Sequence, residues 1–498
     1  MTTINTNVSS LIGQRILTNN NKGLSQSLER LSTGLKINRG ADGPAGLIAS
    51  EKLRSDKEAL TAAIGNAERA DQVLNVAEGG LNEVQSLLTE LQGLVGESAN
   101  DAGLSTEEKE ANQFQVDQIL QTIDRISSTT SFGDTKLLNG SQDFQVSSVA
   151  GTVSDYQINA AKFDSDSSVA VQAVVVASAQ HAGLFVSTGA TLDLTNATDS
   201  FVVEVAGKEG SREFSFASGT TVAQIATAIN TFTDVTGVSA AASGTGVVIK
   251  STGYGSDEFV SFNITTVAGQ AGDVMTLSTI DEDVSSTASA VTFANVSAPI
   301  RDEGQDVAGM VNGLAARGDG LTLSVSSDTL DVELTLTAAG ATSAGTVSAL
   351  TIDDGGAKFN IGPEINLSNQ IRLGIQSTAA RNLGNSTDGF LDTLKSGGTN
   401  SLLSENLGDA QKIVNNAIDQ VSKMRGRLGS VQSNVIGSTI NTLNIAFENT
   451  AAAESAIRDT DFAAETAALT RSQILVSAAT TVVSISNSRP QSVLGLIG

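Results

Sequence analysis

The 498-residue chain contains no cysteine, no tryptophan and a single histidine, His181. The absence of cysteine excludes a disulfide framework and any zinc site with Cys ligands. One histidine excludes a two-His zinc site within a single chain and leaves at most one residue to serve a Ser/His or Cys/His nucleophilic system. We therefore expect no metal, no cofactor and no enzymatic activity, with His181 as an ordinary surface or turn residue.

Positive charge is also scarce, because 54 Asp and Glu residues stand against 29 Lys and Arg, for a formal charge of -25. A surface of this sign repels phosphate backbones and anionic lipids, which disfavours nucleic-acid binding and adsorption to membranes. The first 20 residues lack the cationic start and apolar run of a cleaved signal peptide. No unbroken apolar run approaches the roughly 18 residues of a spanning helix, so we expect no membrane insertion.

Proline is rare as well, with four residues, and long helical patterns occupy both ends of the chain. Leu24, Leu28, Leu31 and Leu35 follow one another at helical spacings. The segment 40–44 contains two glycines and a proline, which oppose helix continuation, and its proline suits the first turn of a new helix. The sequence therefore predicts a helix, a break and a second helix.

The C-terminal end has a similar organisation. A break is expected near 458–461, before a last amphipathic helix. Pro490 is expected to set off an apolar tail, 493–497.

From Leu60 onward, apolar side chains recur in a strict seven-residue register. Because a helix of this length cannot bury its apolar stripe alone, we expect this series to pack against a C-terminal series in the same register. The predicted seam consists of Leu60, Leu74, Leu81, Val84, Leu88, Leu91 and Val95 on the N-terminal side and of Leu407, Val414, Val421, Met424, Leu428, Val431 and Val435 on the C-terminal side.

Residues 141–402 differ in character from both ends. Alternating runs such as 201–205 and 330–334 have the period of strands, and 151–402 contain 27 acidic against 10 basic residues. The sequence therefore predicts an α+β multidomain protein, in which N- and C-terminal helices pack as an α-helical coiled-coil core and a central, mainly β insertion faces solvent. The expected parts are an N-terminal helix (1–43), the first part of a helical core (44–140), the insertion (141–402), the second part of the core (403–457) and a C-terminal helix (458–498).

Several motifs at both ends make the chain resemble bacterial flagellin, the subunit of the flagellar filament. The resemblance covers about 1–140 and 403–498. Its motifs are LSTGLKIN (31–38), ADGPAGL (41–47), FGDTKLLNG (132–140), IRDTDF (457–462), QIL (473–475) and PQSVL (490–494). Within the insertion, 220–251 is similar to the flagellin hook IN module, which we expect over about 200–265.

The resemblance implies a structural protein whose terminal helices form the core of a helical homopolymer and whose insertion faces outward. It implies an extracellular location on the bacterial flagellum, reached by type III export in an unfolded form without a cleaved signal peptide. Identical subunits are the implied main partners. Flagellar cap and hook-junction proteins, and an export chaperone on the C-terminal helix, are the other implied partners.

The two extreme ends carry the expected polymerisation interface. An apolar tail such as 493–497 is stable in water only when a partner covers it, and a subunit that repeats one non-self-complementary contact builds an open helix. The expected interface residues are Ile4, Val8, Leu11, Leu24, Leu28, Leu31, Leu35, Leu469, Ile474, Leu475, Val482, Val493, Leu494 and Leu496.

Flagellins that activate a vertebrate Toll-like receptor present an Arg on a core helix, a Leu four residues later and a Gln three residues beyond. The resemblance places Glu90, Leu94 and Glu97 at these positions. Because Glu90 reverses the charge at the centre of that contact, we expect weak or absent receptor activation.

Two other functions stay open at this point. The first is the hook-filament junction protein of the same family, which forms a short ring. The second is a secreted acidic adhesin or binding module carried by the insertion. An enzyme grafted into the insertion ranks last, because it would need a motif such as H-E-x-x-H, which the chain lacks.

Overall fold

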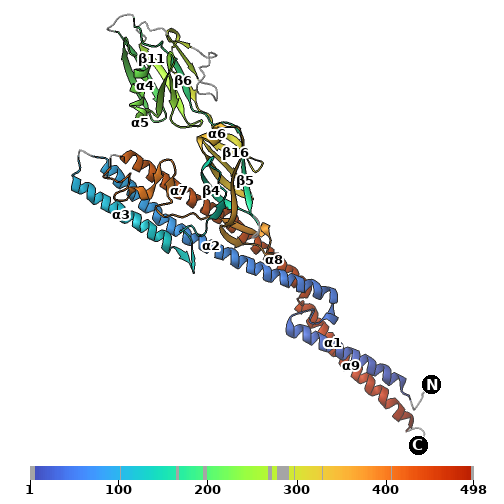
Figure 1. Ribbon diagram of the computed structural model, residues 1–498. Helices are drawn as coiled ribbons and strands as arrows, with labels where there is room; N and C mark the ends of the chain where they lie inside the picture. The colour runs from blue at the N-terminus through green and yellow to red at the C-terminus, as the bar shows by residue number, and fades with distance from the viewer. Residues whose placement is uncertain are drawn as a thin grey trace. The chain divides into compact units, whose positions relative to one another are not determined.

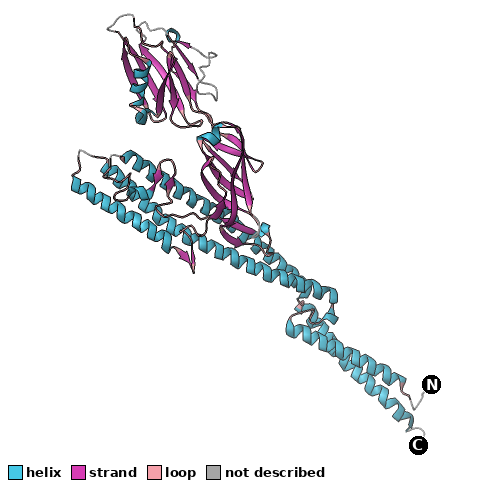
Figure 2. Ribbon diagram, viewed as in Figure 1, coloured by secondary structure: helices cyan, strands magenta, loops and turns pink. Residues whose placement is uncertain are grey.

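The computed structural model describes residues 6–100, 103–163, 168–194, 199–266, 272–276, 291–296, 298–327, 329–404 and 406–494. The chain divides into two compact units. The terminal unit contains residues 1–71, 360–369 and 431–498, and the central unit contains 72–359 and 370–430. Helices dominate the terminal unit, whereas the central unit combines helices with β-sheets (Figures 1 and 2).

The terminal unit is built from both ends of the chain. α1 (Val8–Thr33) lies beside α9 (Phe462–Leu494), as Figure 1 shows. The first part of α2 (Pro44–Ser98) packs against α8 (Ser438–Arg458) through a small apolar cluster that includes Leu60. The predicted packing of N-terminal against C-terminal helices is therefore confirmed.

Both predicted helix breaks are confirmed. α1 ends at Gly34, which lies in the left-handed region with φ of 73°, and a 3-10 turn, Gly40–Asp42, precedes the start of α2 at Pro44. Asp461 caps α9 by accepting hydrogen bonds from the N–H groups of Ala463 and Ala464. The prediction that Pro490 sets off a separate tail was wrong, because α9 continues to Leu494. A proline removes one backbone donor, and the other hydrogen bonds of the helix remain available.

Three helices form the helical part of the central unit: α2 from Gln72 onward, α3 (Thr106–Thr129) and α7 (Leu407–Ser430). α2 and α7 run antiparallel, linked by an ion pair between Glu78 and Arg425 at 2.8 Å and, further along, by a hydrogen bond between Gln92 and Asn415. The seam residues that lie buried in this unit are Leu74, Leu81, Val84, Leu88, Leu91, Val95, Val414, Val421, Met424 and Leu428, whereas Leu407 is half-buried.

The seven-residue register changes at the end of α7. Residues Val431–Gly437 form a π-helix, whose wider turn shifts every following side chain by one position. Val435, which the register placed in the seam, is 40% exposed, and Ile436 is 1% exposed in its place. Val431 is half-buried. The buried series then continues with Leu443, seven residues after Ile436.

A ten-stranded antiparallel sheet and one apolar core occupy the inner part of the insertion. In β18, for example, Leu330, Val332, Leu334 and Leu336 alternate into that core. The strands, in their order across the sheet, are β20 (Ala357–Asn360), β21 (Gln370–Leu373), β4 (Val153–Ala161), β18 (Leu330–Leu336), β17 (Thr322–Ser326), β16 (Leu314–Asp319), β15 (Ala308–Val311), β5 (Val169–Ala177), β19 (Gly345–Gly355) and β3 (Phe144–Ser147).

Two further sheets share a second core with α4 (Val222–Asn230). α4 begins with a capping box formed by Thr221 and Gln224 and buries Ile225 and Ile229. One sheet contains β13 (Val291–Thr292), β12 (Asp273–Thr276), β6 (Gly183–Ser187), β10 (Gly246–Ser251) and β9 (Val238–Ser243), and the other contains β14 (Ile300–Glu303), β11 (Phe259–Thr266), β7 (Ser200–Gly207) and β8 (Ser211–Ala217).

A polar contact ties α7 to the chain that follows β21. The guanidinium of Arg427 donates a hydrogen bond from Nη2 to the carbonyl of Gly374 at 3.0 Å. Burial lowers the pKa of Arg427, and burial raises the pKa of the nearby Asp143 carboxyl. The insertion is thus fixed to the helical part by desolvated polar groups as well as by chain connectivity.

Replacing one or the other of two adjacent glycines of α2 by alanine should change the free energy of unfolding in opposite directions. An alanine Cβ at position 79 would meet nothing within 4 Å, so Gly79→Ala should raise the free energy of unfolding by about 1 kcal/mol through helix propensity. At Gly80 the Cβ would lie 2.7 Å from Cδ1 of Leu138, a fully buried side chain, and 3.0 Å from Oγ1 of Thr130. Overpacking costs about 1 to 3 kcal/mol, so Gly80→Ala should lower the stability. Thermal unfolding followed by circular dichroism tests both, and an equal gain from the two variants would contradict the close packing at Gly80.

Candidate functional site: the apolar surface of the α1/α9 pair

The seam between α1 and α9 is lined mainly by small side chains. The helices run antiparallel, with Ser10 Oγ donating to Asn487 Oδ1 at 2.6 Å near one end and Arg30 paired with Glu465 at 3.6 Å near the other. A Cβ added to Gly13 would lie 2.9 Å from Cγ2 of Val483, so the helices are closely packed there. The buried positions of the pair are Ser10, Gly13, Ser27, Ala479 and Ser486.

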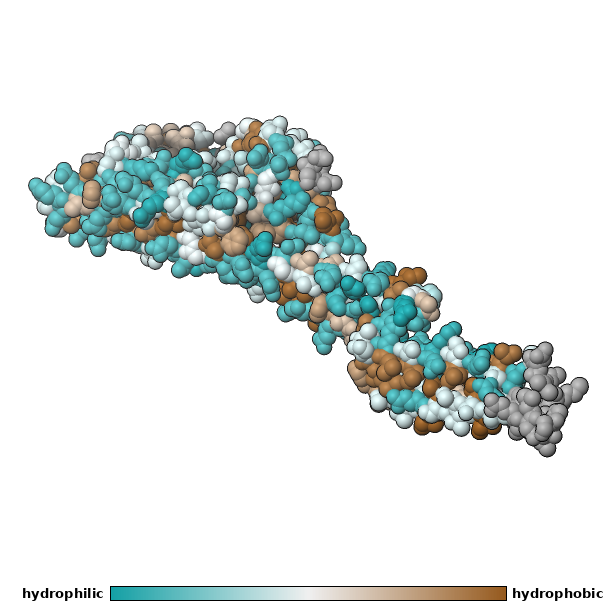
Figure 3. All heavy atoms as spheres, turned by 90° about the horizontal axis from the view of Figure 1, so that it is seen from below, coloured by the Kyte–Doolittle hydropathy of each residue, from teal (hydrophilic) through white to brown (hydrophobic). Residues whose placement is uncertain are grey.

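The large apolar side chains of the same two helices lie mostly outside this seam. Figure 3 shows hydrophobic patches over the part of the molecule formed by α1 and α9. Soluble monomers rarely expose contiguous apolar patches of more than a few hundred Å², so a surface of this kind indicates a binding site. Nine side chains that are 45 to 63% exposed make up what we call the apolar surface: Val8, Leu11, Ile12, Ile16, Leu28, Ile474, Leu475, Val482 and Ile485.

The structure separates the interface residues that the sequence grouped together. Val8, Leu11, Leu28, Ile474, Leu475 and Val482 belong to the apolar surface. Leu24, Leu31, Leu35 and Leu469 are half-buried, with Leu24 and Leu31 facing the α1/α9 seam in register with Ser10 and Ser27. Ile4 and Leu496 lie outside the described residues, and only the backbone of Val493 and Leu494, in the last turn of α9, is described.

Three members of the apolar surface escaped the sequence interpretation: Ile12, Ile16 and Ile485. The signal for the first two was present, because Val8, Ile12 and Ile16 recur every four residues and therefore share one helix face. On α1, side chains that face α9 and side chains that face away from it occur along the same stretch of sequence. The row of leucines indicates only the side that faces α9.

The two breaks at the base of the pair are joined to each other. Leu35 and Asp459 form an antiparallel β-bridge. The Lys36 N–H donates to the Arg458 carbonyl at 2.6 Å, and the Thr460 N–H donates to the Gly34 carbonyl at 2.9 Å. We call this connection the hinge clasp, comprising residues 34–36 and 458–460.

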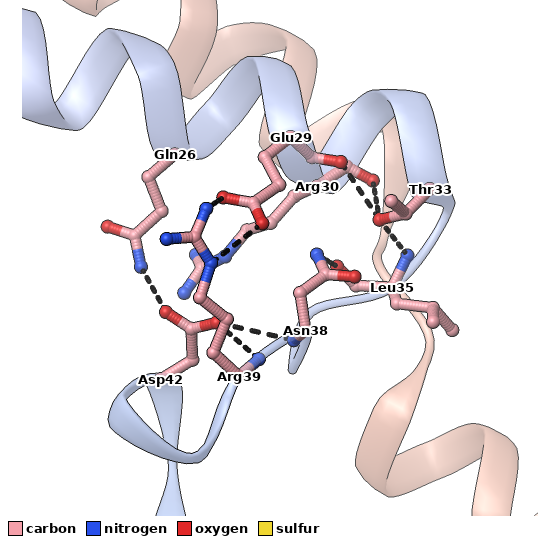
Figure 4. Close-up of polar contacts among 8 residues, drawn as sticks. All are labelled: Gln26, Glu29, Arg30, Thr33, Leu35, Asn38, Arg39 and Asp42. Carbon is pink, nitrogen blue, oxygen red and sulfur yellow. Dashed lines mark hydrogen bonds and ion pairs between the residues drawn. The ribbon is translucent and has the colours of Figure 1, made fainter.

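Side chains hold the turn that follows the hinge clasp, as Figure 4 shows. Arg39 forms a bidentate contact with Glu29, with Nε to Oε1 at 3.0 Å and Nη2 to Oε2 at 2.6 Å. The Asp42 carboxylate accepts hydrogen bonds from the Arg39 N–H at 2.9 Å and from Gln26 Nε2 at 3.2 Å. The Glu29 contact raises the pKa of Arg39, and the backbone hydrogen bond from Arg39 lowers the pKa of Asp42. Because the pKa of Asp42 is lowered in the folded protein, its ionised carboxylate stabilises the turn at neutral pH. This stabilisation is lost as the pH falls through the lowered pKa.

The positions matched to receptor contacts lie on α2 in the central unit. Glu90 and Glu97 are exposed, but Leu94 is only 8% exposed. A side chain with so little exposure offers a receptor almost no apolar area in the monomer.

Other features of the described residues bear on the excluded functions. His181 is partly buried, with Nδ1 2.9 Å from the Gly253 carbonyl and its ring tilted by 33° against the ring of Tyr254, at 3.7 Å between centroids. Among the residues that the structure describes, no group of three or more His, Asp or Glu side chains is arranged to hold a metal ion.

One described helix, Phe462–Ser488 in α9, is long and apolar enough to cross a membrane by length and composition, with a mean hydropathy of 1.2. It reaches this value without an unbroken apolar run, because alanine, valine, leucine and isoleucine outweigh its serine and threonine residues. The same helix carries Glu465, which pairs with Arg30 of α1. The absence of membrane insertion stays a prediction.

Comparison with known proteins identifies three matching regions. Residues 4–143 match the bacterial flagellin N-terminal helical region, and residues 411–497 match the bacterial flagellin C-terminal helical region. Residues 191–253 match the flagellin hook IN motif, which overlaps the region where the sequence suggested it.

Similarity to individual proteins extends over the whole chain. The B-type flagellin of Pseudomonas aeruginosa is 30% identical, and the match covers 99% of this chain and 99% of that protein. A flagellin of Clostridium tyrobutyricum is 27% identical over 98% of this chain and 100% of its own length. Among solved structures, the match to the flagellar hook associated protein-3 of Legionella pneumophila covers 82% of this chain and 96% of that chain at 13% identity. The TM-score of this match is only 0.26.

Proposed function

The chain belongs to the bacterial flagellin family, and we propose that its copies join through the large apolar side chains that the α1/α9 pair leaves exposed. As a flagellin it is a structural subunit of the flagellar filament, the extracellular polymer that bacteria use for motility. The observation that carries the proposal is the division within the pair, with small side chains at its buried positions and most of the large apolar side chains exposed.

The energetics support this assignment. Moving each of the nine side chains from about half to full burial contributes on the order of 1 kcal/mol. Together these contributions are comparable to the roughly 4 to 15 kcal/mol that association loses in translational and rotational freedom. We propose that each copy joins the next through a contact that is not self-complementary, because repetition of such a contact gives an open helix.

We propose the following arrangement of the parts. Residues 1–43 and 458–498 form the inner core of the filament, and residues 44–140 and 403–457 form the surrounding helical layer. Residues 141–402 face outward. The charge distribution supports this, since 151–402 contain 27 acidic and 10 basic residues, and repulsion between identical copies is weakest where water and salt separate them.

Further partners follow from the same premise. Before assembly the exposed side chains of α9 need cover, which suits an export chaperone bound to the C-terminal helix. Export in an unfolded form without a cleaved signal peptide, and contacts with flagellar cap and hook-junction proteins at the filament ends, belong to the same proposal. No nucleic acid and no membrane insertion are part of it.

The proposal favours a filament subunit over the hook-filament junction protein. The relatives that this chain matches from end to end are named as flagellins. The adhesin alternative rests on the insertion alone, and no described feature of 141–402 identifies a ligand for it.

The apolar surface predicts how a charge affects assembly. Val482→Asp places a carboxylate on the outer face of α9, where a neighbour should cover it, and an unpaired charge is costly to bury. We expect the critical concentration for filament growth to rise by about tenfold or more, as measured by sedimentation of polymer. Thr480→Asp adds the same charge at an exposed polar position of the same helix and should change the critical concentration little. Equal behaviour of the two variants would contradict the proposed interface.

The close packing at Gly13 predicts a second effect. Gly13→Ala drives a methyl group against Val483, and overpacking of about 1 to 3 kcal/mol should force the two helices apart and misplace the apolar surface. We expect filaments of this variant to dissociate at a lower temperature in light-scattering melts. Gly23→Ala is the matched control, because its Cβ would meet only Ser472 Oγ at 3.9 Å. Its filaments should dissociate at the wild-type temperature or above, and the same lowering in both variants would refute a specific role of Gly13.

The receptor-contact positions predict weak immune recognition. Glu90 has the wrong charge and Leu94 is nearly buried, so purified monomer should signal at about a tenth or less of the strength of an activating flagellin in a cell reporter assay. Glu90→Arg should restore only part of the signal, since Leu94 stays buried. Full-strength signalling by the unmodified monomer would rule this out.

A further inference from the structure

A loop of the insertion belongs to the terminal unit. Residues 361–369 connect β20 to β21 and pack with α8 rather than with the ten-stranded sheet. Ile361 and Gly362 are buried and anchor the loop. A groove of about 240 Å³ remains between the loop and α8, lined by Ser438, Thr439, Thr442 and Leu443 on the helix side. The loop is therefore anchored on the terminal unit, although a groove separates part of it from α8.

The polar side chains of this loop hold its own backbone. Its two ends meet where the Ile361 N–H donates to the Asn369 carbonyl at 2.9 Å. Within the loop, Asn366 Oδ1 accepts from the Asn369 N–H at 2.9 Å, and Asn369 Nδ2 donates to the Glu364 carbonyl at 3.0 Å. These bonds fix the loop conformation in advance, which lowers the entropy that a binding event would otherwise lose.

The apolar side chains at the tip of the loop are exposed. Ile365 is 87% exposed, the highest value among the large hydrophobic side chains of the described residues, and Leu367 is 44% exposed. A loop whose role is to cover its own helix would turn these residues inward, because each gains from leaving water. In this loop the polar side chains bond to the loop's own backbone and the apolar side chains are exposed to solvent. This is the arrangement of a preformed contact surface.

We propose that the tip of this loop, Pro363 to Leu367, is a second contact between copies, seated on the helical surface of a neighbouring subunit. The loop belongs to the same compact unit as the helices that are proposed to polymerise, so a subunit that joins its neighbours through this unit brings the loop close to other copies. α8 itself leaves Ile445 61% exposed, which offers the neighbour an apolar surface to meet. This inference rests on the proposed function, since it requires terminal units to assemble.

The test uses the absence of cysteine from the chain, which allows a single reporter thiol. Ile365→Cys should react rapidly with a maleimide in the monomer and at least about tenfold more slowly in filaments. Val235→Cys, at a 50% exposed position of the IN-like module, is the control and should react at similar rates in both states. Unchanged labelling of the Ile365→Cys variant on assembly, or protection only when purified cap or junction protein is added, would overturn the contact between copies.

A second measurement separates this contact from the apolar surface of the α1/α9 pair. Ile365→Asp should raise the critical concentration by about tenfold, while Ile365→Val should behave as the wild type. Normal growth of Ile365→Asp would refute the second contact. Normal growth of the Val482→Asp variant would instead refute the α1/α9 interface and leave the labelling result at position 365 intact, so the two proposals fail separately.

Discussion

The narrow seam between α1 and α9 is the constraint on which the rest of the molecule depends. Ser10, Gly13, Ser27, Ala479 and Ser486 allow the helices to approach closely, but they bury little apolar area. At about 25 cal/mol per Å², so small an area offsets little of the roughly 1 to 2 kcal/mol that ordering each residue's backbone costs. In the proposed filament, the pair would gain further stabilisation when another copy covers the surface that faces away from the seam. We propose that order at the two chain ends is coupled to assembly in this way.

In contrast to the α1/α9 seam, the helices of the central unit bury large apolar side chains between them. Leu74, Leu81, Leu88 and Leu91 are fully buried between its helices, and the β-sheets of the insertion enclose two apolar cores of their own. These side chains leave water within a single copy. On the proposed function, the acidic central unit would fold within one copy, and the α1/α9 pair would supply the contacts between copies.

The fold class followed from the heptad pattern and the switch to strand period, because both are long-range signals that single residues do not disturb. Val435 was misplaced because a π-helix adds one residue to a turn, and nothing in a seven-residue repeat marks that insertion. Leu24 and Leu28 were grouped on one stripe, yet the first faces α9 and the second faces solvent. Periodicity identifies an apolar face, but it does not tell whether a helix of the same chain or of another chain will cover it.

The hinge clasp holds the two chain ends together at the base of the α1/α9 pair. Because Gly34 and Lys36 exchange backbone hydrogen bonds with Thr460 and Arg458, the end of α1 and the start of α9 are fixed at the same level. The Arg30–Glu465 ion pair adds a side-chain contact at this base. With that end held, the register of α1 against α9 is set, and the small residues of the seam can meet. The apolar surface is therefore a property of the paired helices, since five of its nine side chains lie on α1 and four lie on α9.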